Sequence, residues 1–303
     1  MCIRDRLVTK FLPYVDEKFA TESKTSIMTN QDFDFAGANI VKVYKISTAE
    51  MNDYMRHPPV VPGGVGAYGS RYGEAKDLDA TTESFMLTKD RSFTFVIDKL
   101  DEDETGQQLE GAKALERQLR EVVIPEVDTH AYSVMCENAG TVPDTVELTP
   151  DNIYDEITKA SEVLDDSEVP ETERVLVVTP NTYRIMKKCK EIILNTDIGE
   201  DMRIKGVIAN LDGATVVKVP AKRLPNGFGF MLIHPSATVA PTKLADYKIH
   251  RDPPGISGSL VEGRVNYDAF VLENKAKAIY YQAQPAAETE TEAGGDQNEE
   301  TTE

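Results

Sequence analysis

Residues 252–264, DPPGISGSLVEGR, have glycines spaced like those of a phosphate-binding loop. In such loops the glycines lead into a helix N-terminus, because its unpaired N–H groups and its dipole hold the anion. Here they lead into VNYDAFVLENKAKAIYY, whose Val, Phe, Ile and Tyr residues are typical of strands. No Lys-Ser or Lys-Thr pair closes the loop. The sequence therefore favours a bend in the chain over a nucleotide site.

Histidines and cysteines could bind a metal, but none has the spacing of a metal site. The four histidines are scattered: His57, His130, His234 and His250. They match neither HExxH nor HxH, the patterns that bring two imidazoles to one ion. The three cysteines have no paired spacing either: Cys2, Cys136 and Cys189. This excludes a disulfide framework and fits a reducing, cytosolic origin.

Two local features allow a second interpretation. Cys189 is predicted on an amphipathic helix among lysines, which would lower the pKa of its thiol and make it reactive. A packed structural thiol is favoured. The carboxylates of residues 98–105, DKLDEDET, suit calcium, but the glycine and the terminal glutamate of a calcium loop are missing. These acids instead complement the dipole of a following helix. With no GxSxG motif either, we predict no catalytic residue, no metal site and no cofactor.

Two groups of side chains could contact a macromolecule. One group is basic and lies on a predicted surface helix, where a solvated face is favoured over an anion-binding patch: Arg184, Lys187, Lys188 and Lys190. The other combines two residue types that are enriched at protein interfaces: Tyr54, Arg56, Arg71 and Tyr72. We predict that this second group contacts another subunit, with an idle loop as the alternative.

The Tyr and Arg group flanks a long loop between two predicted strands. The strands start at NIVKVYKIST (39–48) and at KDRSFTFVIDKL (89–100), where apolar and polar residues alternate. About forty residues separate them, a length that inside a compact domain usually marks a functional or disordered segment. The tip, HPPVVPGGVGAYGSRYG, contains three prolines and five glycines, which exclude regular structure there.

A long helix and an α/β region follow the loop. Apolar residues recur at helical spacing from about residue 101 to Gly140, and Pro125 is expected to kink this helix. Thr149 and Thr179 each precede a proline and are predicted N-caps of two further helices. Short apolar runs such as RVLVVTP and GFMLIHP predict buried strands between the helices. The fold class is therefore α+β.

Composition limits the possible partners. The chain has 303 residues and a net charge of −19, which argues against a nucleic-acid binder held by phosphate contacts. Residues 284–303 carry seven acidic side chains, no basic one and no apolar residue larger than alanine, so we expect this tail to be disordered. No apolar run is long enough for a membrane span. Residues 1–6, MCIRDR, resemble a translated sequencing adapter and are not expected to belong to the fold.

Four segments, in this order, resemble the major capsid proteins of tailed bacteriophages, with the Hong Kong phage-like capsid fold: VKVYKISTAEMNDYMR, RSFTFVIDK, REVVIPEVD and GSLVEGRVNYDAFVLENKAKAIY. The resemblance covers about residues 10–283. It implies an N-terminal arm (1–38), an extended loop with flanking strands (39–98), a peripheral domain with a spine helix (99–142), an axial domain (143–254) and return strands of the peripheral domain (255–283). DPPGISGSLVEGR would then be the crossing between the two domains. The loop tip is longer than usual, and the acidic tail lies outside the pattern.

The resemblance also implies a function. Subunits would assemble as hexamers and pentamers into an icosahedral head that encloses double-stranded DNA without binding it specifically. A separate scaffolding protein and a portal would be partners, no membrane would be involved, and the protein would pass from the host cytoplasm into the virion. An encapsulin-type nanocompartment shell is the alternative. A cytosolic α/β enzyme built on residues 143–250 is a remote one, because no convergent polar site is visible there.

Overall fold

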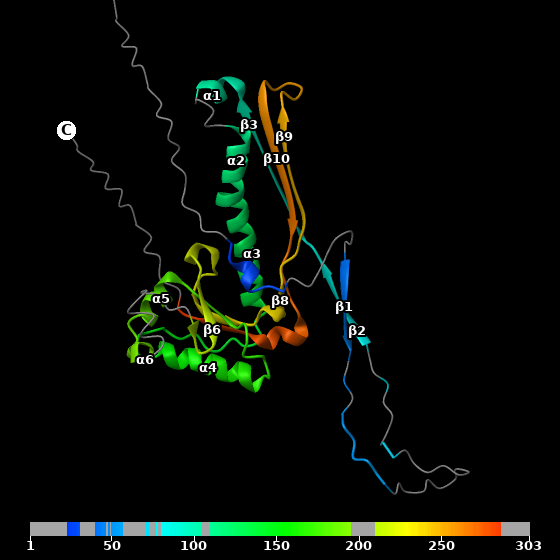
Figure 1. Cartoon of the computed structure of the whole chain (residues 1–303), viewed down its shortest axis with the longest axis vertical. Coiled ribbons are helices and arrows are strands. Elements are labelled where there is room, and N and C mark those ends of the chain that lie inside the picture. The colour runs from blue at the N-terminus through cyan, green and yellow to red at the C-terminus, as the bar shows by residue number, and fades with distance from the viewer. Residues whose placement is uncertain are drawn as a thin grey trace, which may run out of the picture. The chain divides into compact units, whose positions relative to one another are not determined.

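The computed structural model describes residues 23–30, 40–46, 48, 50–56, 71–72, 77, 80–104, 110–194 and 210–285. The chain divides into two compact units, residues 35–87 and the remainder, which are described separately (Figure 1). The predicted acidic tail beyond residue 285, His57 and most of the predicted N-terminal arm lie outside the described residues. Within the described part, no helix is long and apolar enough to cross a membrane.

The smaller unit is built on a β-hairpin. Strand β1 (Ile40–Ile46) pairs antiparallel with β2 (Ala80–Met86), and Lys45 and Glu83 form an ion pair of 3.3 Å on it. The strand expected from residue 39 is therefore confirmed. The sequence prediction missed β2, which is polar at most of its positions, and treated it as part of the loop. A two-stranded hairpin is at best marginally stable in water by itself.

The larger unit contains a five-stranded mixed sheet. Its order is β12 (Ile279–Ala283), β7 (Phe228–Ile233), β4 (Val175–Val178), β6 (Ala214–Lys218) and β5 (Asn210–Leu211). Strands β4 and β7 are buried at every position, as their continuous apolar sequences predicted. Helices α4 (Ile153–Asp166), α5 (Pro180–Met186) and α6 (Lys190–Leu194) contribute Ile157, Met186 and Ile192 to the same core.

The two predicted Thr-Pro helix starts have different outcomes. Thr179 is the N-cap of α5, and its hydroxyl accepts a hydrogen bond from the N–H of Thr182 at 3.1 Å. The prediction for Thr149 is wrong, because α4 begins three residues later and Asn152 occupies the cap position. Asn152 also accepts a hydrogen bond from the N–H of Thr149 at 2.8 Å. Residues 149–152 therefore form a turn before the helix.

The predicted long helix is real but begins later than expected. A short helix, α1 (Lys99–Glu104), contains most of the acidic stretch, and the long helix consists of α2 (Gly111–Gln118), a π-helical segment (Leu119–Val123) and α3 (Ile124–Glu137). The π segment ends at Val123, two residues before Pro125, and its last hydrogen bond runs from the Ile124 N–H to the Leu119 carbonyl. Pro125 has no N–H to donate, so the wider turn lies where a regular helix would lose a bond.

A second, three-stranded antiparallel sheet lies beside the long helix. Its order is β3 (Lys89–Asp98), β10 (Gly258–Tyr267) and β9 (Thr242–Arg251). Residues 252–257 form the tight turn between β9 and β10, closed by the Asp252 N–H donating to the Gly258 carbonyl at 2.7 Å. The interpretation of DPPGISGSLVEGR as a crossing between domains is therefore wrong. The expected domain boundary after residue 254 falls inside this turn.

Short elements complete the unit. Strands β8 (Thr238–Val239) and β11 (Phe270–Val271) pair with each other, and four 3₁₀ turns lie at Thr25–Ile27, Ala221–Arg223, Pro235–Ala237 and Glu273–Ala278. Met28 is fully buried in the core of this unit. The described part of the predicted arm, residues 23–30, is therefore anchored on the core.

Candidate functional site

Three of the four predicted contact residues meet in the hairpin unit. The rings of Tyr54 and Tyr72 lie edge to face with centroids 5.2 Å apart. The N–H of Met55 donates to the carbonyl of Arg71 at 3.0 Å, and the Asn52 side chain donates to the carbonyl of Tyr72. These contacts hold the two ends of the loop together, and the fourth residue, Arg56, is exposed next to them.

This group presents an apolar surface to solvent. Tyr54 is 52% exposed, Tyr72 is 78% exposed and Met55 is 49% exposed. Exposed aromatic rings held rigidly by backbone hydrogen bonds provide contact area at a low entropic cost. The arrangement suits contact with another macromolecule. Whether that partner is another subunit stays a prediction.

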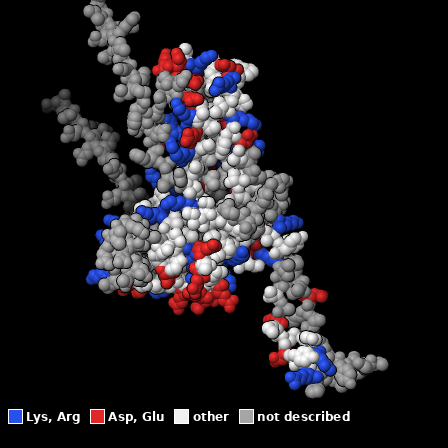
Figure 2. All heavy atoms as spheres, viewed as in Figure 1, with Lys and Arg blue, Asp and Glu red and all other residues white. Residues whose placement is uncertain are grey.

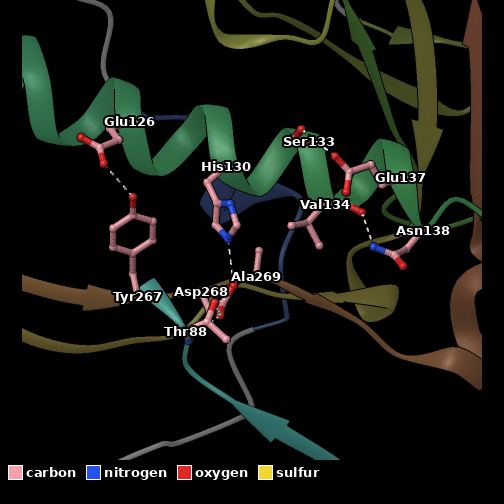
Figure 3. Close-up of polar contacts among 10 residues, drawn as sticks. All are labelled: Thr88, Glu126, His130, Ser133, Val134, Glu137, Asn138, Tyr267, Asp268 and Ala269. Atoms are coloured by element: carbon pink, nitrogen blue, oxygen red, sulfur yellow. Dashed lines mark hydrogen bonds and ion pairs between the residues drawn. The ribbon is translucent and has the colours of Figure 1, made fainter. Parts of the chain in front are cut away.

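The larger unit contains a polar junction that the sequence prediction missed (Figure 3). The carboxylate of Asp268, just after β10, accepts hydrogen bonds from the N–H and the hydroxyl of Thr88, both at 2.8 Å. It also contacts Nε2 of His130 on α3 at 2.8 Å and accepts a bond from the Ala269 N–H at 2.9 Å. The Asp268 side chain is only 6% exposed. One buried carboxylate thus joins the start of β3, the long helix and the end of β10.

A second contact lies one helical turn away on the same helix (Figure 3). The Tyr267 hydroxyl donates to Glu126 at 3.3 Å. Arg91 on β3 forms an ion pair with the same carboxylate at 2.7 Å. Burial, together with the negative charge of Glu126, raises the pKa of Tyr267 to about 12. Glu126 and His130 are four residues apart, so both side chains reach the sheet from one face of α3.

Asp268 is expected to make the fold sensitive to acid. Burial alone would raise the pKa of this carboxyl, but its hydrogen bonds with His130, Thr88 and Ala269 outweigh burial and hold the pKa below its ordinary value. Such a group stabilises the folded protein above the unfolded-state pKa of about 3.9, and this contribution is lost as the pH falls through the lower folded-state pKa.

We therefore expect Asp268→Asn to be less stable than the unsubstituted protein at pH 7, and to lose less of its stability below about pH 4. Urea titrations of the unassembled subunit between pH 3 and pH 7 measure both effects. Parallel pH profiles of the two proteins would contradict this role of Asp268.

A buried ion pair anchors residues 23–30. A carboxylate oxygen of Asp128 on α3 lies 2.7 Å from a guanidinium nitrogen of Arg223, and the two side chains are 2% and 7% exposed. The second carboxylate oxygen of Asp128 accepts hydrogen bonds from the hydroxyls of Ser23 at 2.6 Å and Thr25 at 3.3 Å. Asp128 therefore connects the long helix, the Ala221–Arg223 turn and the anchored part of the arm.

The metal and thiol candidates have structural roles where they are described. His130 contacts Asp268, as described above. His234 forms a hydrogen bond with the Ser236 hydroxyl, and burial lowers the pKa of its imidazole. Nε2 of His250 lies 3.4 Å from a carboxylate oxygen of Glu262. Among the described residues, no group of three or more His, Cys, Asp or Glu side chains could hold a metal ion.

Both described cysteines are packed in the core. Cys189 is 1% exposed, which favours the packed thiol over the reactive one. Burial raises the pKa of the Cys136 thiol to about 12, so this group stays protonated at neutral pH.

Comparison with known proteins identifies the fold. No protein-family model and no curated protein matches the sequence. Solved structures do match over nearly the whole chain. A structure from Mycobacterium phage Che8 has a TM-score of 0.73 at 18% identity, covering 93% of this chain and 98% of that one.

Two further structures are similar. The capsid structure of the cyanophage P-SCSP1u has a TM-score of 0.72 at 12% identity and covers 93% of this chain and 94% of its own. The mature capsid of bacteriophage PhiM1 has a TM-score of 0.65 at 13% identity and covers 92% of both chains. The chain therefore has the fold of tailed-phage capsid subunits, as its sequence resemblance implied.

Proposed function

We propose that this chain is a major capsid protein that self-assembles into the icosahedral head of a tailed phage around its double-stranded DNA. The observation that carries the proposal is the near-complete coverage of both chains in the match to phage capsid structures. A fold shared over its full length leaves little of either chain for a different activity. The role is structural, and no reaction is assigned to the chain.

The proposal extends to organisation and partners. The five-stranded sheet with α4, α5 and α6 corresponds to an axial domain, and the long helix with the three-stranded sheet to a peripheral domain. The hairpin of β1 and β2, with the residues between them, corresponds to the extended loop. Subunits form hexamers and pentamers, with a scaffolding protein and a portal as further partners. Assembly starts in the host cytoplasm, and DNA is enclosed without specific contacts, in keeping with the net charge of −19.

Assembly of the purified protein tests the proposal. We expect closed, roughly spherical shells, formed by the protein alone or with its scaffolding protein. Moderate salt is expected to promote them, because it screens the repulsion between negatively charged subunits over a Debye length of about 10 Å. Sedimentation velocity and electron microscopy at two salt concentrations measure this. A stable monomer at both concentrations, with and without scaffolding protein, would contradict the proposal.

Loss of the exposed aromatic pair is expected to weaken assembly without affecting the subunit. Aromatic residues at the centre of an interface often contribute about 2 kcal/mol or more each, so the double variant Tyr54→Ala, Tyr72→Ala should raise the critical concentration for assembly by at least about tenfold. The thermal midpoint of the subunit should stay unchanged.

The matched control for this prediction is Tyr44→Ala. Tyr44 lies on β1 of the same unit and is 72% exposed. The Tyr44→Ala variant should assemble like the unsubstituted protein. If the double variant also assembles normally, the pair has no role in contacts between subunits.

A further inference from the structure

Two oppositely charged segments of the chain have no part in the function proposed above. One is the acidic stretch of residues 284–303, with seven carboxylates and no basic side chain. The other is the basic group on α5, on the turn that follows it and at the start of α6. Lys218 at the end of β6 extends this group, and we call the five residues the basic patch: Arg184, Lys187, Lys188, Lys190 and Lys218.

The basic patch lies on the outer surface of its domain. One side of α5 is buried in the core through Thr182, Tyr183 and Met186. Arg184 of the same helix is exposed, and so are Lys188, Lys190 and Lys218. Figure 2 shows basic side chains at the edge of the domain where Figure 1 places α5 and α6, and acidic ones along α4. Glu191 is an acidic residue on the basic side.

One aromatic ring joins two cations of this patch. The ammonium groups of Lys187 and Lys218 lie 5.0 Å and 4.5 Å from the centroid of the Tyr183 ring. Each contact is attractive, but the arrangement also holds two like charges close together. An anion on this surface would relieve their repulsion.

The described chain ends beside the same helix. The N–H of Gln284 donates to the carbonyl of Gly227 at 2.8 Å, and its side-chain amide donates to the carbonyl of Phe228 at 2.9 Å. The next carbonyl, that of Gly229, accepts a hydrogen bond from the Thr182 hydroxyl of α5 at 2.9 Å. Three consecutive residues therefore connect the end of β12 to the first turn of α5.

The acidic residues that follow are within reach of the patch. An extended chain spans about 3.4 Å per residue, so Glu288 can lie up to about 14 Å from Gln284, and Glu290 and Glu292 farther still. Met186, the last residue of α5, lies about 6 Å beyond Thr182 along the helix axis at a rise of about 1.5 Å per residue, and Lys187 and Lys188 follow it directly. Attachment at Gln284 keeps these carboxylates at a high effective concentration near the patch.

We propose that the acidic C-terminal tail binds in cis to the basic patch of its own subunit, mainly through Glu288, Glu290 and Glu292. The tail thereby occupies a cationic surface that would otherwise attract other polyanions, nucleic acid among them. Because exposed ion pairs contribute little to stability, removing the tail leaves the thermal midpoint nearly unchanged. The contact weakens with salt.

Carbodiimide crosslinking of the unassembled full-length subunit tests the contact, because this reagent joins only carboxylates and amines that touch. A mixture of ¹⁵N-labelled and unlabelled protein distinguishes crosslinks within a chain from those between chains. We expect amides between Lys187, Lys188 or Lys190 and residues 288–292, within one chain, at 50 mM salt but not at 500 mM. Absence of these amides, or their formation only between chains, would overturn the proposal.

Lysine acetylation provides a second readout that does not depend on assembly. The variant Glu288→Gln, Glu290→Gln, Glu292→Gln keeps the length of the tail and should raise the acetylation rates of Lys188 and Lys190 by about threefold at low salt. Lys248 on β9, which pairs with Asp246, is the internal control and should not change.

A matched variant removes three charges farther from the attachment point: Asp296→Asn, Glu299→Gln, Glu300→Gln. It should have a smaller effect on the acetylation rates. If both triple variants leave the rates unchanged while a 12-nucleotide single-stranded DNA lowers them in the unsubstituted protein, the patch serves nucleic acid and the proposal is wrong.

Discussion

Replacing Asp128 by Asn is expected to destabilise the subunit by about 3–5 kcal/mol, because it removes the negative charge that lies 2.7 Å from the buried guanidinium of Arg223. Both side chains are almost fully shielded from water, at 2% and 7% exposure. Asparagine has nearly the same size, so no cavity contributes to the effect. A loss of this size is a large fraction of the roughly 5–15 kcal/mol that stabilises a typical domain. Urea denaturation of the unassembled subunit measures it.

Two further variants separate the charge effect from others. The double variant Asp128→Asn, Arg223→Met removes both charges and should recover much of the lost stability. Asp90→Asn breaks the exposed ion pair between Asp90 and Arg264, where both side chains are more than 40% exposed, and should change little. If Asp128→Asn were no more harmful than Asp90→Asn, the buried pair would not anchor the helix.

Replacing Gly258 by Ala is expected to destabilise the three-stranded sheet by about 3 kcal/mol or more, since strain and overpacking add there. Gly258 has a φ of +143°, a backbone conformation that residues other than glycine rarely adopt. A Cβ at this position would lie 2.1 Å from the carbonyl oxygen of Ile97, on the paired strand β3. Backbone atoms cannot move aside as a flexible side chain can, so the β3–β10 pairing must open.

Gly255→Ala is the matched control in the same turn. Gly255 also has a positive φ, +86°, but a Cβ there would meet nothing within 4 Å. This variant should lose only about 1–2 kcal/mol of stability, because a residue with a Cβ is disfavoured at positive φ. The difference between the two variants in urea denaturation isolates the close approach of the strands. Equal losses of stability in the two variants would show that the close contact with the Ile97 carbonyl is not what destabilises Gly258→Ala.

Local chemistry made much of the larger unit predictable. The runs at Val175–Val178 and Phe228–Ile233 are apolar without interruption, which fits strands buried on both faces. Thr179 was predictable as an N-cap because its partner lies three residues away. At Thr149 the same signal failed, because residues 149–152 form a turn in which the Asn152 side chain accepts a hydrogen bond from the Thr149 N–H, and α4 begins only at Ile153.

The polar junctions were not predictable, because their partners are far apart in the sequence. Asp128 and Arg223 are separated by 95 residues, and Asp268 and Thr88 by 180. No spacing rule covers such pairs. A buried acid in the apolar stretch VNYDAFV was the only local sign of the second junction. The turn at residues 252–257 was misread because its glycines were assigned to a domain crossing, although the flanking strands pair along their whole length.

The π segment at Leu119–Val123 sets the rotational phase of the long helix. One residue corresponds to about 100° around an α-helix, so a single residue accommodated in a wider turn rotates everything before it relative to everything after it. On one side of the segment, Gly111 of α2 faces Val261 and Ile249 of the three-stranded sheet. On the other side, Tyr132 and Met135 of α3 face the main core. A chain one residue shorter between Gln118 and Ile124 could satisfy only one of these two faces.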